Sequence, residues 1–216
     1  CSSDLQIGQV VRKDGPASHL VKAGTPTMGG ALILLSLLVP TVLWADLRNP
    51  FVLATTAVTA GYGLIGYLDG YLKIKRKSSG GLAGRYKLTG QFLIGGAAIG
   101  YTFLLDKRMP ADWNEIKTHL TFPFVAYSKF SVELPLFVYV AFAILVVVAV
   151  SNAVNLTDGL DGLAIMPVVM VGSALGIFAY VTGNAVFSKY LLFPYIPGAG
   201  ELMVFCAAMA GAGVAF

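Results

Sequence analysis

The sequence has little charge and almost no cysteine. Only 12% of its 216 residues are Asp, Glu, Lys or Arg, about half of the share that soluble domains carry. Two cysteines cannot build a disulfide framework, and Cys206 lies in an apolar stretch where a buried thiol is expected. The net charge is a modest +4, so nothing suggests a nucleic-acid partner. These shortages argue against an ordinary soluble domain.

Apolar residues dominate the chain instead, and they come in long runs. They make up 56% of it, and its mean hydropathy is +0.76. A membrane-spanning helix needs about 20 mostly apolar residues and satisfies its own backbone hydrogen bonds. We therefore predict an all-α integral membrane protein, a polytopic helical bundle that forms one domain over residues 1–216. The charge-free runs are Gly24–Ala45, Phe51–Leu68, Leu88–Leu105, Leu134–Thr157, Gly162–Ser188 and Leu202 onward, which predicts about six spans.

Both ends of the chain are expected to be cut from a longer protein. The sequence begins without Met and stops at Phe216, inside an apolar run. The polar first ~27 residues do not resemble a signal peptide. Pro40 and Pro167 fall within two of the runs, where proline is expected to kink a helix.

Alternation of the spans assigns the connections to two sides of a membrane. One side holds 1–27, 69–87 and 156–161, and the other holds 46–50, 106–133 and 183–201. The first set carries nine Lys and Arg residues and the second carries six. Because cytoplasmic loops are enriched in these residues, we place the first set in the cytoplasm and the second in the periplasm. The long outer connection 106–133 is predicted to form a small surface hairpin, with His119 solvated.

Polar clusters occur at three span ends, all on the predicted cytoplasmic side. The first runs from Lys22 to Gly30, where Lys22 suits a phosphate or a uracil carbonyl and the threonines offer hydroxyl groups. It is equally the start of a helix, with Thr25 as N-cap and Pro26 in the first turn.

The second cluster runs from Asp69 to Lys73, directly after an apolar span. A carboxylate at the membrane edge can take a proton from a lipid-borne phosphate or bind a cation. The alternative is an ordinary helix end with a solvated Asp69. The basic run Lys73–Lys77 then contacts phospholipids, a role that is compatible with binding a phosphate-bearing substrate.

The third cluster runs from Ser151 to Gly162 and contains two amides, two carboxylates and two glycines. We predict that the helix ends near Asn155 and that a glycine-containing turn brings Asp158 and Asp161 inward. Such oxygens suit Mg²⁺ or the polar groups of a nucleoside. The alternative is a simple loop with an Asx-type cap.

Three glycine patterns are better explained by helix packing. The spacing Gly61-x-Gly63-x-x-Gly66 fits a dinucleotide-binding fingerprint, but it lies in an apolar run without a strand before it. Gly96-x-x-x-Gly100 and Gly172-x-x-x-Gly176 are typical of packed membrane helices.

At the polar clusters the sequence resembles the phospho-N-acetylmuramoyl-pentapeptide transferase family. The matching strings are Asp14-Gly-Pro16 with His19, Gly24-Thr-Pro-Thr-Met-Gly-Gly30, Asp69 with Tyr71–Lys77, Tyr86-Lys-Leu88 with Gly90-Gln91, and Asn152–Gly162. They keep the family's order and spacing over nearly the whole chain. The resemblance implies a bacterial inner-membrane fold of ten transmembrane helices, usually a homodimer surrounded by membrane lipids, with the active site facing the cytoplasm.

The resemblance also implies an activity and a set of site residues. Phospho-MurNAc-pentapeptide passes from UDP-MurNAc-pentapeptide to undecaprenyl phosphate, with Mg²⁺, and UMP is released. Asp69 corresponds to the base that deprotonates the lipid phosphate and, with Asp158 and Asp161, to the catalytic carboxylates. Asp158 is also the metal ligand that the resemblance implies within this chain. The substrate-binding positions implied are Lys22, Thr27, Lys73, Arg85, Asn152, Asn155 and Gly159.

Two departures from the family pattern bear on activity. The family has two adjacent aspartates where this chain has Asp69-Gly70. The family's later Met-Gly-Asp loop, which holds its main metal ligand, and its triple-histidine motif follow beyond Phe216. We therefore expect this chain to be inactive alone.

Other functions remain open from the sequence. A related enzyme that transfers N-acetylhexosamine-1-phosphate shares the aspartates and the Asn-x-x-Asp-Gly loop. A transporter would need polar residues at mid-membrane depth, whereas these crowd one face. Gly70 also permits a catalytically degenerate protein.

Overall fold

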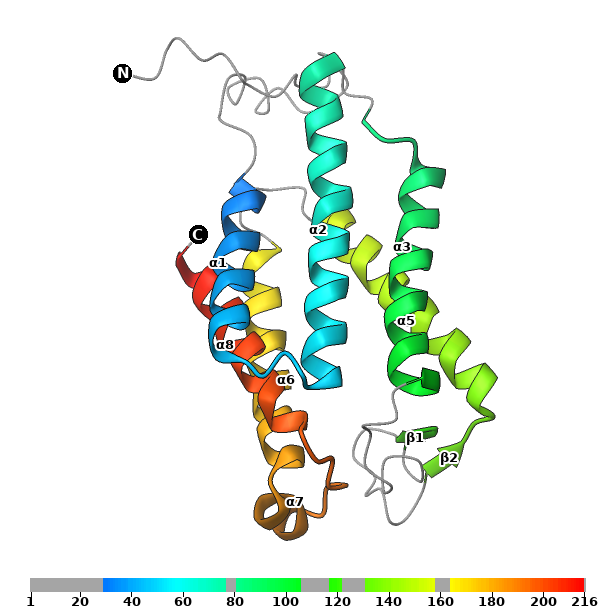
Figure 1. The fold of residues 1–216 in the computed structure, drawn as a ribbon, viewed down its shortest axis with the longest axis vertical. Helices are drawn as coiled ribbons and strands as arrows, with labels where there is room; N and C mark the ends of the chain where they lie inside the picture. Colours follow the sequence, from blue (N-terminus) through cyan, green and yellow to red (C-terminus); the bar gives the residue numbers. More distant parts are fainter. Residues whose placement is uncertain (1–28, 77–80, 106–116, 122–130, 158–163, 216) are drawn as a thin grey trace.

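The computed structural model describes residues 29–76, 81–105, 117–121, 131–157 and 164–215. Figure 1 shows a bundle of helices with a small two-stranded hairpin at one end. The elements in chain order are α1 (Gly29–Trp44), α2 (Pro50–Arg76), α3 (Gly84–Gly100), the π-helical turn η2 (Tyr101–Leu105), β1 (His119–Thr121), β2 (Ser131–Glu133), α5 (Leu136–Thr157), α6 (Ile165–Gly183), α7 (Ala185–Leu191), the 3₁₀ turn η3 (Ala199–Glu201) and α8 (Leu202–Ala215).

The described helices have the length and the surface of a membrane protein. Much apolar side-chain surface points outward, with Phe137 83% and Leu93 73% exposed. Such a surface requires lipid or further helices around it. The helices long and apolar enough to cross a membrane are Pro50–Lys73, Leu136–Leu156 and Ile165–Gly183, and two shorter apolar helices are Gly30–Trp44 and Ala199–Ala215. The all-α membrane fold is thus confirmed, while the count of six spans stays a prediction.

Helix α2 is longer than the sequence analysis predicted. It continues to Arg76, so the connection expected to begin at residue 69 is helical over residues 69–76. Gly70, the glycine within this extension, destabilises the helix by only about 1 kcal/mol relative to alanine. Against that cost, Asp69 and Lys73 form an i,i+4 ion pair, and three basic side chains occupy the last turn, where the helix dipole favours positive charge. Asp69 therefore lies on a helix and not in a loop.

Two further helix boundaries differ from the prediction. Helix α5 ends at Thr157, two residues beyond the expected end near Asn155. The apolar run that begins at Gly162 divides into α6 and α7, because Asn184 interrupts it and its side chain accepts the N–H groups of Val186 and Phe187. The outer connection 183–201 thus contains a short helix that the sequence analysis did not predict.

The two prolines do not end their helices. Pro40 lies inside α1, which continues through it. Pro167 lies in the first turn of α6, where its missing N–H would have no intrahelical partner.

Helix α8 packs against both α6 and α1, and α3 packs against both α2 and α5. Side chains added at Gly172 and Gly176 would collide with Met209 and Cys206 of α8, and one at Gly61 would collide with Ile94 of α3. The packing interpretation of these glycines is confirmed, whereas Gly66 and Gly100 face open space. Cys206 is a buried free thiol, as predicted.

The predicted hairpin in the connection 106–133 is present. Strands β1 and β2 pair antiparallel, with His119 opposite Glu133 and Thr121 opposite Ser131. The imidazole Nδ1 of His119 lies 3.1 Å from the Ser131 hydroxyl oxygen. His119 is half-buried against the second strand, so its side chain is only partly solvated.

Candidate active site

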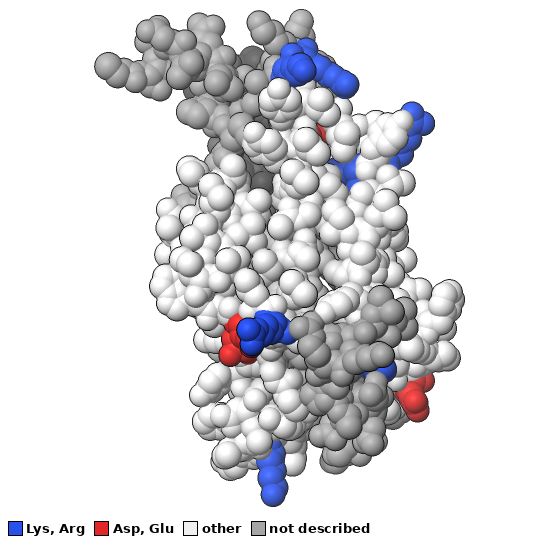
Figure 2. All heavy atoms as spheres, in the orientation of Figure 1, with Lys and Arg blue, Asp and Glu red and all other residues white. Residues whose placement is uncertain are grey.

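Basic side chains gather at one end of the bundle. In Figure 2 they form the blue clusters at the top of the molecule, above a broad uncharged band. Figure 1 shows that the end of α2 projects there beyond its neighbours and that α3 begins nearby. The described basic residues of this end are Lys73, Lys75, Arg76, Arg85 and Lys87. Among the described residues, Asp69 is the only acidic one at this end.

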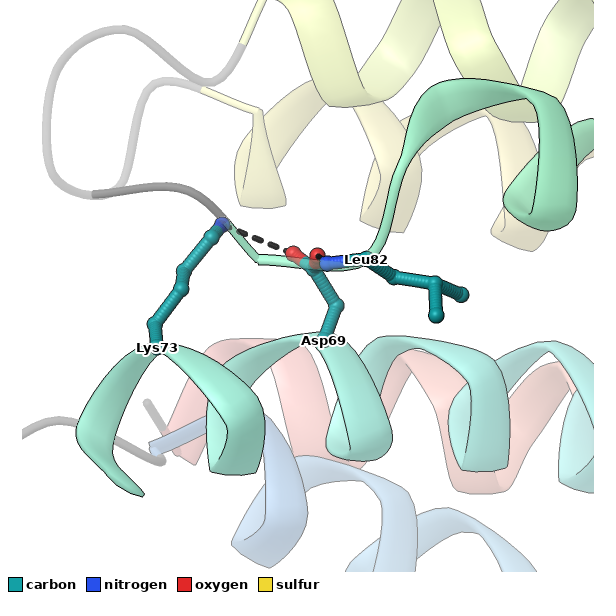
Figure 3. Close-up of polar contacts among 3 residues, drawn as sticks. All are labelled: Asp69, Lys73 and Leu82. Atoms are coloured by element: carbon teal, nitrogen blue, oxygen red, sulfur yellow. Dashed lines mark hydrogen bonds and ion pairs between the residues drawn. The ribbon is translucent and has the colours of Figure 1, made fainter. Parts of the chain in front are cut away.

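Asp69 is held by two partners from different segments, as Figure 3 shows. The ammonium group of Lys73 lies 2.7 Å from its Oδ2. The backbone N–H of Leu82 donates to its Oδ1 at 2.7 Å. An ammonium group and an N–H donor are the partners of an ionised carboxylate. The Asp69 side chain is 17% exposed and that of Lys73 is 35% exposed, so the pair is shielded yet still accessible from one side.

The chain approaches Asp69 closely because residue 81 is glycine. A Cβ atom at Gly81 would collide with the Asp69 carboxylate and with Cε of Lys73. Only a residue without a side chain fits at this crossing without displacing the ion pair. The contact fixes the segment that leads into α3, and therefore Arg85, relative to the end of α2. Gly81 was not among the predicted site residues, although the pair Gly80-Gly81 after a basic run is the available signal in the sequence.

Gly70, next to Asp69, is not required by the fold. A Cβ atom added there meets nothing within 4 Å, and the backbone has no left-handed conformation at this position. A Cβ atom is therefore tolerated at position 70, so the described residues do not require glycine there.

Arg85 lies on the exposed surface in the first turn of α3. Its guanidinium lies 5.1 Å from the centre of the Tyr86 ring, a distance typical of a cation–π contact. The Tyr86 ring orients the guanidinium, and the N–H groups of the guanidinium stay available to a phosphate.

A second polar group lies deeper, between α3 and α5. The Nδ2 of Asn152 donates to Oε1 of Gln91 at 2.7 Å and to the carbonyl oxygen of Val148 at 2.8 Å. Asn155 is exposed, one helical turn closer to the end of α5. Gln91 was not among the predicted site residues, yet an amide inside a charge-free run is itself a signal of function.

The remaining predicted site residues cannot be placed in the structure. Lys22, Thr27, Asp158, Gly159 and Asp161 lie outside the described residues. The structure therefore brings together Asp69, Lys73 and the start of α3, and it places Asn152 in a separate interior network.

The described residues alone do not fit a Mg²⁺ site. Within the described ranges no three His, Cys, Asp or Glu side chains cluster. Asp69 lies beside an ammonium group, whereas Mg²⁺ favours several oxygen ligands. A metal at this end needs carboxylates from segments other than those described.

An apolar cavity of about 450 Å³ lies elsewhere in the bundle, among α1, α2, α3, α5 and α8. It is lined by side chains such as Leu37, Val58, Ile99 and Phe205 and contains no titratable group. The cavity therefore offers no acid–base chemistry, and the candidate site stays at the basic end.

Known protein families and a curated relative match this chain over most of its length. The family model described as glycosyl transferase family 4 matches residues 52–216. The phospho-N-acetylmuramoyl-pentapeptide-transferase signature 1 matches residues 22–34. A phospho-N-acetylmuramoyl-pentapeptide-transferase of Sorangium cellulosum (strain So ce56) is 67% identical over 215 residues, which cover 98% of this chain and 57% of that relative. The chain thus spans somewhat more than half the length of the curated relative it matches.

Proposed function

This chain belongs to glycosyl transferase family 4, and from that premise we propose that the whole protein transfers phospho-MurNAc-pentapeptide from UDP-MurNAc-pentapeptide to undecaprenyl phosphate. The products are lipid I and UMP. The observation that carries the proposal is the 67% identity to a phospho-N-acetylmuramoyl-pentapeptide-transferase across almost the entire chain. The site geometry agrees with it, because an ion-paired carboxylate lies at the basic end of an apolar bundle.

The proposed reaction is a phosphoryl transfer between two phosphate-bearing substrates. An oxygen of the lipid phosphate, relieved of its proton near Asp69, attacks the sugar-linked phosphorus of the nucleotide sugar. The bond from that phosphorus to the UMP oxygen breaks, and UMP leaves. Positioning and charge stabilisation dominate such transfers. Lys73 supplies positive charge beside Asp69, and Arg85 supplies it elsewhere at the same basic end.

The other proposed roles follow the family resemblance. Lys22, Thr27, Asn152, Asn155 and Gly159 bind the nucleotide sugar, and Asp158 and Asp161 act as catalytic carboxylates. Mg²⁺ is the proposed cofactor with Asp158 as one ligand, and bound Mg²⁺ would neutralise diphosphate charge. We further propose a homodimer in the bacterial inner membrane, with the basic end in the cytoplasm. The excess of Lys and Arg at this end supports that orientation.

One observation favours a second candidate, a related protein that has lost catalysis. Position 70 is glycine, although the backbone leaves space there for a Cβ atom. Without the second carboxylate the site has less capacity to hold charge and protons, so activity has to be measured with both residues at this position.

The test uses the complete gene product in detergent with Mg²⁺ and undecaprenyl phosphate. UMP release is followed from UDP-MurNAc-pentapeptide and from UDP-GlcNAc, with Gly70 as found and with Gly70→Asp and Gly70→Asn. We expect turnover of the muramyl substrate, increased at least about tenfold by Gly70→Asp, which corresponds to about 1.4 kcal/mol in the barrier. The Gly70→Asn variant has a side chain of the same size as aspartate but without its charge, so it should give no increase in turnover.

Two results would count against the proposal. Turnover of UDP-GlcNAc but not of UDP-MurNAc-pentapeptide would show that the substrate is a UDP-hexosamine and not the muramyl nucleotide. Absence of turnover of either substrate in all three versions would leave the catalytically degenerate protein. Residues 1–216 alone are expected to release no UMP.

A further inference from the structure

A chain of neutral polar groups links three helices inside the bundle. Tyr62 of α2 donates its hydroxyl hydrogen to the backbone carbonyl of Gln91 in α3 at 3.0 Å. The Gln91 side chain in turn accepts from Asn152 of α5 at 2.7 Å, and its Nε2 lies 3.4 Å from the Ser151 hydroxyl oxygen. The residues of α3 and α5 that meet here are about sixty positions apart in sequence, so this contact is purely tertiary.

A backbone carbonyl fixes the direction of this chain. The Val148 oxygen, 2.8 Å from the Asn152 amide, can only accept a hydrogen bond. The NH₂ group of Asn152 must therefore face Val148, and its second hydrogen points to Gln91. The side-chain oxygen of Gln91 then faces Asn152, and the side-chain nitrogen of Gln91 faces Ser151. Both side-chain N–H groups of Asn152 are engaged in hydrogen bonds. Its side-chain carbonyl oxygen is therefore the group that it can offer to a ligand.

Burial makes the arrangement stiff. Gln91 is only 4% exposed and lies in an otherwise apolar stretch of α3. Leaving one buried partner of such a pair without a hydrogen bond destabilises the fold. Asn152 lies three residues before Asn155, and residues at this spacing are neighbours on a helix surface. Gln91 thus holds the part of α5 from which the third polar cluster continues.

We propose that Gln91 is a positioning residue that fixes the Asn152 amide so that only its carbonyl oxygen faces the nucleotide sugar. This inference rests on the proposed function. The ligand group that Asn152 meets is then an N–H or a hydroxyl donor, of the kind carried by a nucleoside. Gln91 acts through Asn152 and the end of α5, without touching the substrate.

The test compares isosteric replacements of Gln91 in the complete protein, with whichever residue at position 70 gives turnover. Gln91→Met keeps length and packing but removes the acceptor for Asn152. Gln91→Glu keeps an acceptor, because burial favours the neutral carboxylic acid. We expect Gln91→Met to raise the KM for the UDP-sugar by about tenfold or more, and Gln91→Glu to stay within about threefold of the parent.

Tyr62→Phe is the matched structural control. It removes a hydrogen bond from the same network but leaves the Gln91 and Asn152 side chains paired. It should lower the melting temperature without changing KM for the UDP-sugar. KM and melting temperature are therefore measured for every variant.

The outcomes separate this inference from the proposed function. A Gln91→Met protein with parental KM would overturn the inference alone and reduce Gln91 to a packing residue. The inference also fails if Tyr62→Phe and Gln91→Met raise KM equally. Absence of turnover with either residue at position 70 would overturn the proposed function, and the inference with it.

Discussion

The two polar groups of this bundle are built in opposite ways. The Asp69 group is charged, lies at the end of the bundle, and joins segments thirteen residues apart. The Gln91 group is neutral, lies in the interior, and joins helices about sixty residues apart. A charged pair is tolerated where water reaches it, whereas an interior surrounded by apolar helices accepts only neutral groups that satisfy each other. The first group is therefore suited to chemistry and the second to holding the helices that carry it.

The largest expected effect is at Asp69. Asp69→Asn should lower UMP release by about 10³-fold, within the range for removal of a general base. The fold should persist, because the asparagine oxygen still accepts the Leu82 N–H. The measurement is steady-state turnover together with the melting temperature. A reduction in turnover of less than about tenfold would show that Asp69 has a structural role, as Gln91 does. The two polar groups would then no longer differ in function.

The next effect tests whether the backbone positions Asp69. Gly81→Ala places a methyl group against the carboxylate and the Lys73 side chain, so the ion pair has to shift. A misplacement of about 1 Å at a reacting group costs on the order of 100-fold in rate, and we expect a loss of about 10-fold to 100-fold in kcat. Gly84→Ala is the matched control, since a Cβ there meets nothing within 4 Å. Equal activity of the two variants would contradict a positioning role for residue 81.

The same contrast explains what the sequence could predict. The apolar runs and the carboxylate at their edge are local features, so the membrane fold and the choice of Asp69 as a candidate residue follow directly from them. The extension of α2 to Arg76 did not, because polar and charged residues resemble a loop until their pairing along the helix is known. The split between α6 and α7 was likewise missed, although Asn184 is a strong N-cap residue.

Contacts between residues far apart in the sequence could not be predicted from it. Gln91 and Asn152 lie in separate runs, and nothing in either run specifies which helix faces the other. The collision that makes Gly81 necessary depends on where a connection crosses α2. The resemblance to a known family includes both Gln91 and Asn152 in its matching strings, but it does not show that their side chains are hydrogen-bonded to each other.

A smaller effect measures the interior group without any substrate. Gln91→Met, Asn152→Leu and the double variant form a thermodynamic cycle on unfolding in detergent. Paired buried amides should show a coupling of about 1 kcal/mol, within the range for residues in one hydrogen-bond network. Each single variant leaves the other amide unsatisfied, whereas the double variant removes both, so its destabilisation should be less than the sum. Strict additivity would mean that the Gln91–Asn152 hydrogen bond contributes no net stability.

The smallest effect lies at the opposite end of the bundle, in a region given no part in the chemistry. Asn184→Ala removes the side chain that accepts the N–H groups at the start of α7, and loss of such a cap costs about 1 kcal/mol. The melting temperature should fall slightly, while kcat and KM should stay within about twofold of the parent. Asn184→Ser, which retains a capping oxygen, should restore most of the stability. If Asn184→Ala instead lowers kcat, the two ends of the bundle are coupled, and catalysis cannot be assigned to the basic end alone.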